Sequence, residues 1–156
     1  MRIGQGIDAH AFSDASDRGL WLGLVHVPDA TGLAGHSDAD VATHALCDAL
    51  LGAANLGDLG RHFPDSDPQF RDASSRHLLE ATIGLVHNEG FRVISGDVTI
   101  MAELPRLAPF TPAMSLALSD VVGTTVSVKA TTMEGLGALG RGEGIAASAV
   151  ILLEET

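Results

Sequence analysis

The sequence predicts an α+β fold in which a mixed β-sheet carries helices packed on one of its faces. Three observations lead to this prediction. The 156 residues are enough for one domain, and 46% of them are hydrophobic and can form a single core. The local patterns along the chain follow the order β-β-β-α-α-β-α-β-β, and strands and helices grouped in this way are typical of α+β domains.

The first part of the chain is predicted to form strands. Residues 2–12 form the first strand, which carries Asp8 and His10. Residues 20–27 then form a short hairpin with Gly23 near its turn.

A helix is predicted from about residue 38 to residue 54. Ser37 or Asp38 suits its N-cap, because a short polar side chain can accept a hydrogen bond from the first turn, and Asn55 suits its end. Small and apolar residues recur every four positions and indicate a close-packing face: Val41, Ala45, Ala49 and Ala53. A separate polar row follows the same spacing: Asp40, His44 and Asp48.

The rest of the chain alternates between helices and strands. We expect helices at residues 74–89 and 112–122, and strands at residues 91–102, 124–132 and 145–153. The strand at 91–102 is expected to bulge at Gly96. Two segments rich in glycine are expected to lack regular structure, at residues 57–68 and 133–144.

Helices on one face leave the other face of the sheet uncovered. The strands around residues 126–128 and 147–153 nevertheless carry apolar side chains on both faces. Self-association through the open face is therefore expected.

Composition excludes several classes of partner. The net charge is −11 and no stripe of Lys or Arg is present, which argues against nucleic-acid binding. No apolar run approaches the roughly 20 residues of a membrane span, and the first residues carry charge without a hydrophobic region, so neither a membrane segment nor a secretory signal is expected. Cys47 is the only cysteine, which rules out an internal disulfide and fits a cytoplasmic protein.

Side chains that can bind a metal occur in two segments, the first predicted strand and the helix that carries His44. Asp8 and His10 are two residues apart, so in a strand they point to the same side. If this strand lies against the helix that carries His44, the three side chains can converge on one ion. One carboxylate and two imidazoles suit Zn²⁺ and leave a fourth position open for a substrate oxygen, as in catalytic zinc sites. Alternatively, the Asp-x-His pair arises by chance and His44 is a core histidine.

Further polar segments each allow two interpretations. His36 and Ser37 could offer hydroxyl and backbone N–H groups to a phosphate, or serve as a plain helix cap. The segment 129–134 ends with Glu134, whose carboxylate could hold Mg²⁺, although its threonines also suit a strand. Asp58 and Asp65 could contact a substrate or simply cap turns. Arg141 and Glu143 could form a solvated ion pair.

Six short motifs occur in one order along nearly the whole chain. They are Gly6-Ile7-Asp8-Ala9-His10, Gly35-His36-Ser37-Asp38-Ala39-Asp40, Gly57-Asp58-Leu59-Gly60, Phe63-Pro64-Asp65-Ser66-Asp67-Pro68, Lys129-Ala130-Thr131-Thr132 and Gly140-Arg141-Gly142-Glu143-Gly144. In this combination the chain closely resembles the 2-C-methyl-D-erythritol 2,4-cyclodiphosphate synthase family of the non-mevalonate isoprenoid pathway. The resemblance runs from about residue 3 to residue 153.

The resemblance implies a homotrimer with three active sites between adjacent subunits. It implies a phosphorus-oxygen lyase that cyclises 4-diphosphocytidyl-2-C-methyl-D-erythritol 2-phosphate and releases CMP. The 2-phosphate oxygen attacks the β-phosphorus of the same molecule, so the enzyme needs no nucleophile of its own.

The resemblance also implies a role for individual residues. Asp8, His10 and His44 would bind zinc, and Glu134 would bind a second ion, Mg²⁺ or Mn²⁺. The substrate contacts fall into three groups: His36 and Ser37 at the phosphorylated end; Asp58, Gly60, Phe63 and Asp65 around the methylerythritol; and Ala102, Arg106, Leu107, Thr131 and Thr132 around the cytidine diphosphate. Thr132 and Glu134 join the zinc ligands as catalytic residues, and Arg141 is a further substrate contact.

The chain departs from the family pattern at several positions. Arg106 stands where lysine is commoner, and Met133 replaces a usual threonine. Ile7 and Ala138 occupy places often held by phenylalanines that line a cavity on the trimer axis. Binding of an isoprenoid in that cavity is therefore in question, although Arg141 and Glu143 could still form a polar ring at its mouth.

Two other functions remain as alternatives to the cyclase. One is a zinc-dependent phosphodiesterase, in which the open zinc position activates water. The other is a non-catalytic trimeric module that binds small metabolites, and it would tolerate loss of the candidate zinc ligands.

Overall fold

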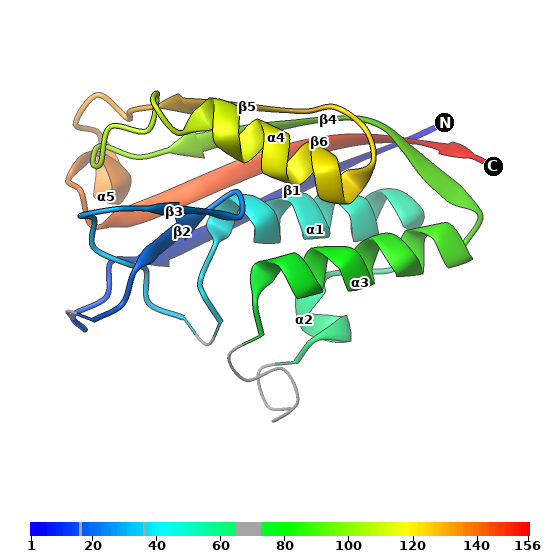
Figure 1. Ribbon diagram of the computed structural model, residues 1–156, viewed down its shortest axis with the longest axis horizontal. Helices are drawn as coiled ribbons and strands as arrows, with labels where there is room; N and C mark the ends of the chain where they lie inside the picture. Colours follow the sequence, from blue (N-terminus) through cyan, green and yellow to red (C-terminus); the bar gives the residue numbers. More distant parts are fainter. Residues whose placement is uncertain (16, 36, 65–72) are drawn as a thin grey trace.

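The computed structural model describes residues 1–15, 17–35, 37–64 and 73–156 (Figure 1). Its elements follow in the order β1 (Arg2–Ala11), β2 (Leu20–Leu22), β3 (Val25–Val27), α1 (Val41–Ala54), α2 (Leu59–His62), α3 (Ser75–Asn88), β4 (Phe91–Met101), α4 (Thr111–Val122), β5 (Val126–Thr131), α5 (Gly137–Gly140) and β6 (Gly144–Glu155). All expected strands and the three long helices are present, with small differences at their ends.

Four strands form the main sheet in the order β1-β6-β4-β5. Strand β6 runs antiparallel to both β1 and β4, whereas β4 and β5 are parallel and are joined through α4. Strands β2 and β3 form a separate two-stranded hairpin. Helices α1 and α4 lie on one side of the main sheet, and α3 packs against α1 (Figure 1). The prediction of a mixed sheet with helices on one face is confirmed.

The other face of the sheet is open in the single chain. Along β1, residues alternate between the helix-covered side and the open side. On the open side Ile3 is 74% exposed and Ile7 is 63% exposed, and Val150 of the neighbouring strand is 39% exposed. These apolar side chains make the open face a candidate for contact with another chain.

Two glycines of β1 allow helix α1 to lie directly on the strand. A Cβ atom built on Gly4 would lie 2.0 Å from the carbonyl oxygen of Ala49, and one built on Gly6 would lie 2.0 Å from that of Ala45. The small-residue face predicted for the helix is therefore the face that meets β1, because only small side chains permit this approach. This close contact fixes the distance between the helix and the following residues of β1.

The first long helix begins later than predicted. It starts at Val41 with Asp40 as its N-cap, so the prediction of Ser37 or Asp38 as the cap is wrong. The physical reason is the backbone of Ala39, whose φ of 54° lies in the left-handed region and cannot belong to the helix.

Asp40 has a structural role in place of the one suggested by the polar row. Its side chain is fully buried, and its carboxylate accepts hydrogen bonds from the backbone N–H groups of Gly23, Leu24 and Thr43 and from the Thr43 hydroxyl. The carboxylate thus joins the β2–β3 turn to the start of α1. Since these hydrogen bonds occupy both oxygens of Asp40, the residues of the predicted polar row, Asp40, His44 and Asp48, do not share one role.

Three smaller details also differ from the predictions. The irregularity in β4 lies between Val93 and Ser95, whereas Gly96 pairs regularly with both neighbouring strands, so the predicted bulge is one or two residues too late. Both glycine-rich segments contain a single helical turn, α2 and α5, where no regular structure is expected.

Within the described ranges, no helix is both long and apolar enough to cross a membrane.

Cys47 lies in the core of helix α1 and is fully buried. Burial raises the pKa of its thiol to about 12, so the reactive thiolate is scarce at neutral pH. We expect the folded protein to react with a disulfide reagent such as DTNB at least 100-fold more slowly than the chain unfolded in guanidinium chloride. Reaction of the folded protein at the rate of the unfolded chain would contradict this burial.

Candidate metal centre

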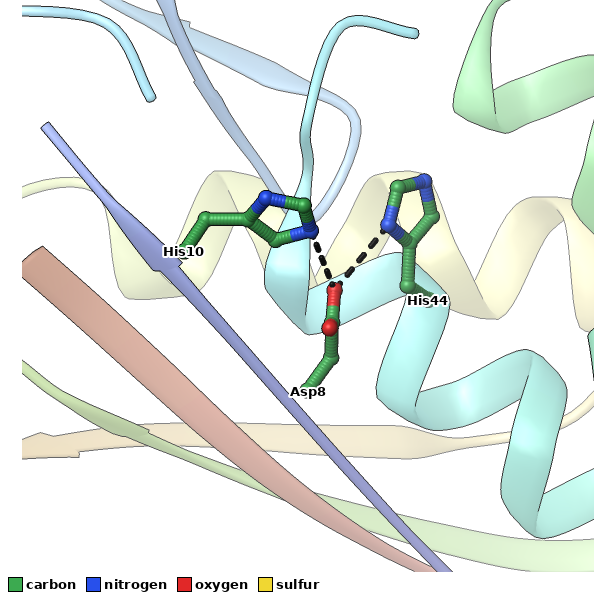
Figure 2. A group of neighbouring side chains, drawn as sticks. All are labelled: Asp8, His10 and His44. Carbon is green, nitrogen blue, oxygen red and sulfur yellow. Dashed lines mark hydrogen bonds and ion pairs between the residues drawn. The ribbon is translucent and has the colours of Figure 1, made fainter. Parts of the chain in front are cut away.

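Asp8, His10 and His44 converge where β1 crosses the first turn of α1 (Figure 2). The Oδ2 atom of Asp8 lies 3.2 Å from Nε2 of His10 and 3.0 Å from Nδ1 of His44. The two imidazoles approach the carboxylate from different elements, one from the strand and one from the helix. The convergence expected from the two sequence spacings is therefore present.

Hydrogen bonds on the far side of each ring select the nitrogen that faces Asp8. The Nδ1 atom of His10 lies 2.5 Å from the carbonyl oxygen of Ala34 and donates to it, which leaves Nε2 as the free ligand atom. The ring of His44 is turned the other way, with Nδ1 toward Asp8 and Nε2 toward the hydroxyls of Ser37 and Ser75.

The three side chains interact with one another electrostatically. Partial burial opposes ionisation of Asp8, but hydrogen bonds and charges from His10 and His44 outweigh it and hold the pKa of the carboxyl well below its usual range. The hydrogen bond to Asp8 raises the pKa of His10. A cation that binds here therefore competes with protons for these side chains.

The arrangement fits a tetrahedral metal ion. The three ligand atoms lie within 4.8 Å of one another. A tetrahedral ion with bonds of about 2.0–2.1 Å needs ligand atoms about 3.3 Å apart, which is close to the two Asp–His distances. In the part of the chain that the structure describes, no other three His, Cys, Asp or Glu side chains are grouped in this way, and Glu134 belongs to no such group.

A pocket of about 280 Å³ opens beside the triad. Three of the predicted substrate contacts line it: Ser37, Gly60 and Phe63. Asp58 does not line this pocket, and its side chain instead caps α2 by accepting a hydrogen bond from the Arg61 N–H. His36 and Asp65 lie outside the described residues.

Asp48 is a pocket residue that the sequence indicates only as part of the polar row. Its carboxylate accepts a hydrogen bond of 2.7 Å from the backbone N–H of Leu59 and so ties α2 to α1. Burial raises its pKa, and the nearby charges of Asp58 and Asp8 act in the same direction. The pocket lining contains two carboxylates, Asp8 and Asp48, so a cation there would favour binding of a phosphorylated ligand.

A second pocket of about 490 Å³ lies between the β4–α4 connection and the end of β5. All five residues expected around a cytidine diphosphate line it: Ala102, Arg106, Leu107, Thr131 and Thr132. Glu134 follows directly, and its carboxylate accepts a hydrogen bond of 3.1 Å from the Thr132 hydroxyl. The two pockets share no lining residue.

With both pockets in view, comparisons with known proteins identify the family. The model of the YgbB family matches residues 1–154. The chain belongs to this family. It is 51% identical over 158 residues to the 2-C-methyl-D-erythritol 2,4-cyclodiphosphate synthase of Nitrosococcus oceani, with 99% of each chain covered.

Solved structures of YgbB-family relatives share the fold. A 2C-methyl-D-erythritol-2,4-cyclodiphosphate synthase in a CDP-bound form superposes with a TM-score of 0.89 at 35% identity, covering 98% of this chain and all of that one. The bifunctional IspDF from Campylobacter jejuni superposes with a TM-score of 0.93 at 39% identity. The match spans 99% of the present chain but only 42% of the length of that bifunctional protein.

One residue that lines the second pocket of this YgbB-family chain, Glu103, is not indicated by any local sequence pattern. Glu103 accepts hydrogen bonds at its Oε1 atom from the backbone N–H groups of Met133, at 2.8 Å, and of Gly135, at 3.4 Å. Between these two residues Glu134 has a φ of 52°, which is unusual for a residue other than glycine. The Glu103 carboxylate thus holds the turn that presents Glu134. No local pattern predicts a contact between residues about 30 positions apart.

Replacing Glu103 by alanine is expected to loosen this turn. Loss of both hydrogen bonds removes about 1–2 kcal/mol of local stability, so the amide hydrogen of Met133 should exchange with solvent about tenfold faster. Both N–H groups bond to the same oxygen, which glutamine retains, so Glu103→Gln serves as the matched control with exchange near that of the original protein. Equal exchange in all three proteins would contradict the proposed restraint.

The remaining predicted polar residues form exposed ion pairs. Arg141 contacts Glu143 with Nε and Oε1 2.7 Å apart, and both side chains are more than half exposed. Lys129 pairs with Asp97 on the open face of the sheet, and this hydrogen bond lowers the pKa of Asp97. In the single chain, Arg141 and Glu143 form a solvated ion pair, as the sequence suggests.

Proposed function

We propose that this chain converts 4-diphosphocytidyl-2-C-methyl-D-erythritol 2-phosphate into 2-C-methyl-D-erythritol 2,4-cyclodiphosphate and CMP. Membership of the YgbB family and about 50% identity to synthases of this name over the full chain support the activity. The observation within this molecule that carries the proposal is the Asp8–His10–His44 triad beside a pocket that has space for a phosphate.

The triad suits zinc, because one carboxylate and two neutral imidazoles are ligands that zinc accepts in catalytic sites. Zinc bound there supplies positive charge and an open position for a phosphate oxygen. On the protein side, Asp8 remains ionised at neutral pH, and Ala34 and Ser75 orient the two rings.

We assign the other residues to the two ends of the substrate. His36 and Ser37 contact the phosphorylated end, and Asp58, Gly60, Phe63 and Asp65 surround the methylerythritol. In the second pocket Arg106 provides a fixed positive charge, Thr131 and Thr132 provide hydroxyls, and Ala102 and Leu107 form the buried apolar wall. Glu134 holds a second divalent ion, Mg²⁺ or Mn²⁺, with Thr132 orienting its carboxylate. Arg141 is an outer substrate contact.

The reaction depends on how the substrate is folded and on positive charge that offsets its crowded phosphates. An oxygen of the 2-phosphate forms a bond to the β-phosphorus, and the bond from that phosphorus to the bridging oxygen breaks, so CMP leaves with the electron pair. No protein nucleophile takes part. The residues of the two pockets contribute orientation, and well-aligned intramolecular reactions reach effective molarities of about 10⁵ M or more.

We further propose that the active unit is a homotrimer with sites between adjacent subunits. Two observations support it. The open sheet face carries the exposed side chains of Ile3 and Ile7, and the two pockets of one chain share no lining residue. A substrate that uses both kinds of pocket can then lie between the triad of one subunit and the second pocket of its neighbour.

Three further assignments belong to the same proposal. Residues 1–156 form one catalytic domain. The protein works in the cytoplasm, in keeping with its single cysteine. On the trimer axis, Ile7 and Ala138 provide less apolar surface than phenylalanines do, so we propose that any isoprenoid binds there weakly.

The reaction is tested by ³¹P NMR of the purified protein with the cytidine-linked substrate, Mg²⁺ and zinc, with and without a chelator. We expect CMP and a cyclic diphosphate, both suppressed by the chelator. CMP together with a linear product would instead indicate a zinc-dependent phosphodiesterase. No turnover under any condition would indicate a module that binds metabolites without catalysis.

A further inference from the structure

Three polar residues from different segments meet behind the His44 ring. Asp38 precedes α1, His44 lies in its first turn, and Ser75 opens α3. The hydroxyl of Ser75 lies 3.1 Å from Nε2 of His44 and donates a hydrogen bond to Oδ1 of Asp38. The backbone N–H of Ser75 donates to the other oxygen of the same carboxylate at 2.9 Å.

The direction of each hydrogen bond follows from the nitrogen that faces the metal position. The Nδ1 atom of His44 points to Asp8, so a metal ion at the triad takes the lone pair of Nδ1 and the ring proton stays on Nε2. This N–H donates to the Ser75 hydroxyl, whose own proton goes to the Asp38 carboxylate. The series Asp38–Ser75–His44 thus has a donor and an acceptor at every step.

Ser75 differs from the other hydroxyl near this ring. Ser37 lies 3.3 Å from Nε2 of His44, but it lines the pocket and is only half-buried. A phosphate that enters the pocket can therefore recruit the Ser37 hydroxyl. Ser75 is fully buried, so its hydroxyl has no access to solvent or ligand and remains available to His44.

We propose that Ser75 and Asp38 are positioning residues, which act through His44 to hold its ring with Nδ1 toward the metal and the proton on Nε2. Partners of this kind on the far side of a ligating histidine commonly change metal affinity by about 10–100-fold. This inference rests on the proposed binding of zinc by the triad and extends it to a residue of α3. It also explains why the start of α3 is fastened to the segment before α1.

The main test is zinc affinity of the Ser75→Ala protein, measured without substrate by competition with a chromophoric chelator. We expect binding about 10–100-fold weaker than in the original protein. The fold should persist, because the backbone N–H of residue 75 keeps its bond to Asp38. Ser74→Ala is the matched control, since Ser74 caps the same helix through the His77 N–H and makes no hydrogen bond to His44. Its zinc affinity should stay within twofold of the original.

A second readout follows the ring proton itself in the zinc-saturated proteins. In the original protein the Nε2 proton of His44 should give a resolved NMR signal that exchanges slowly with water. In Ser75→Ala we expect this exchange to be at least tenfold faster, whereas an effect on helix α3 alone would leave it unchanged. Asp38→Asn should also weaken zinc binding, because an amide cannot accept hydrogen bonds at both of its ends. It provides the test if the serine variant does not fold.

The outcomes separate this inference from the proposed function. Failure of the original protein to bind zinc at the triad would overturn the metal part of the proposed function and this inference with it. Tight binding by the original protein and equal binding by Ser75→Ala would overturn the positioning role alone. An equal loss of affinity in Ser74→Ala would also overturn it, because the effect would then come from the helix as a whole.

Discussion

Replacement of His44 by alanine is expected to remove zinc from the protein and to lower the rate of cyclisation by a factor on the order of 10³ or more. The ring supplies one of three ligands that come within 4.8 Å of one another, and two ligands alone hold zinc poorly. Loss of the cation removes several kcal/mol of charge stabilisation from crowded phosphates in a pocket that also contains Asp48.

The fold should survive this change, because the His44 side chain lines the pocket and does not belong to the apolar core cluster. Metal content per chain and initial rate are the two measurements, with circular dichroism as the check on folding. His87→Ala is the matched control: this histidine is exposed near the end of α3, and its loss should leave both values unchanged. Full turnover by a metal-free His44→Ala protein would contradict the metal assignment.

Replacement of Gly6 by alanine is expected to cause a large loss of stability. The new Cβ atom would lie 2.0 Å from the carbonyl oxygen of Ala45 and 2.7 Å from the backbone nitrogen of Ala49. Both neighbours are helix backbone and cannot turn aside, so the strand and helix must separate. We expect a cost of about 3 kcal/mol or more.

The separation should also reach the metal centre, because Asp8 stands on the strand and His44 on the helix. Thermal unfolding and zinc affinity should therefore both fall in Gly6→Ala. Gly84→Ala is the matched control: Gly84 lies in α3 with no atom within 4 Å of an added Cβ, so alanine should raise helix stability by up to about 1 kcal/mol. An unfolding temperature equal to that of the original protein in Gly6→Ala would contradict the close contact between β1 and α1.

Local patterns in the sequence are enough to predict most of the fold and the grouping of the candidate metal ligands. Alternation in β1 and the four-residue spacing in α1 each depend on neighbours in the chain, so they reveal which side chains share a face. The placement of Asp8 with His10 is of this kind. His44 joins them because the small residues of α1 and the glycines of β1 bring the two elements into contact.

Contacts between distant residues could not be predicted in the same way. By spacing Asp40 belongs to a polar row with His44 and Asp48, yet its carboxylate binds the turn at Gly23 and Leu24. Ser75 and Glu103 look like ordinary polar residues in the sequence, and their roles depend on partners 31 and 32 positions away. The position of the N-cap of α1 depends on the left-handed backbone of Ala39, a conformation that alanine does not favour.

The most direct test of the metal centre is an anomalous difference map at the zinc absorption edge, from crystals of the protein grown with zinc. We predict one strong peak in each chain, about 2.0–2.1 Å from Nε2 of His10, Nδ1 of His44 and a carboxylate oxygen of Asp8. Such a peak would establish the metal centre on which the proposed mechanism depends. A fully formed triad with no peak, or a peak bound elsewhere, would contradict it.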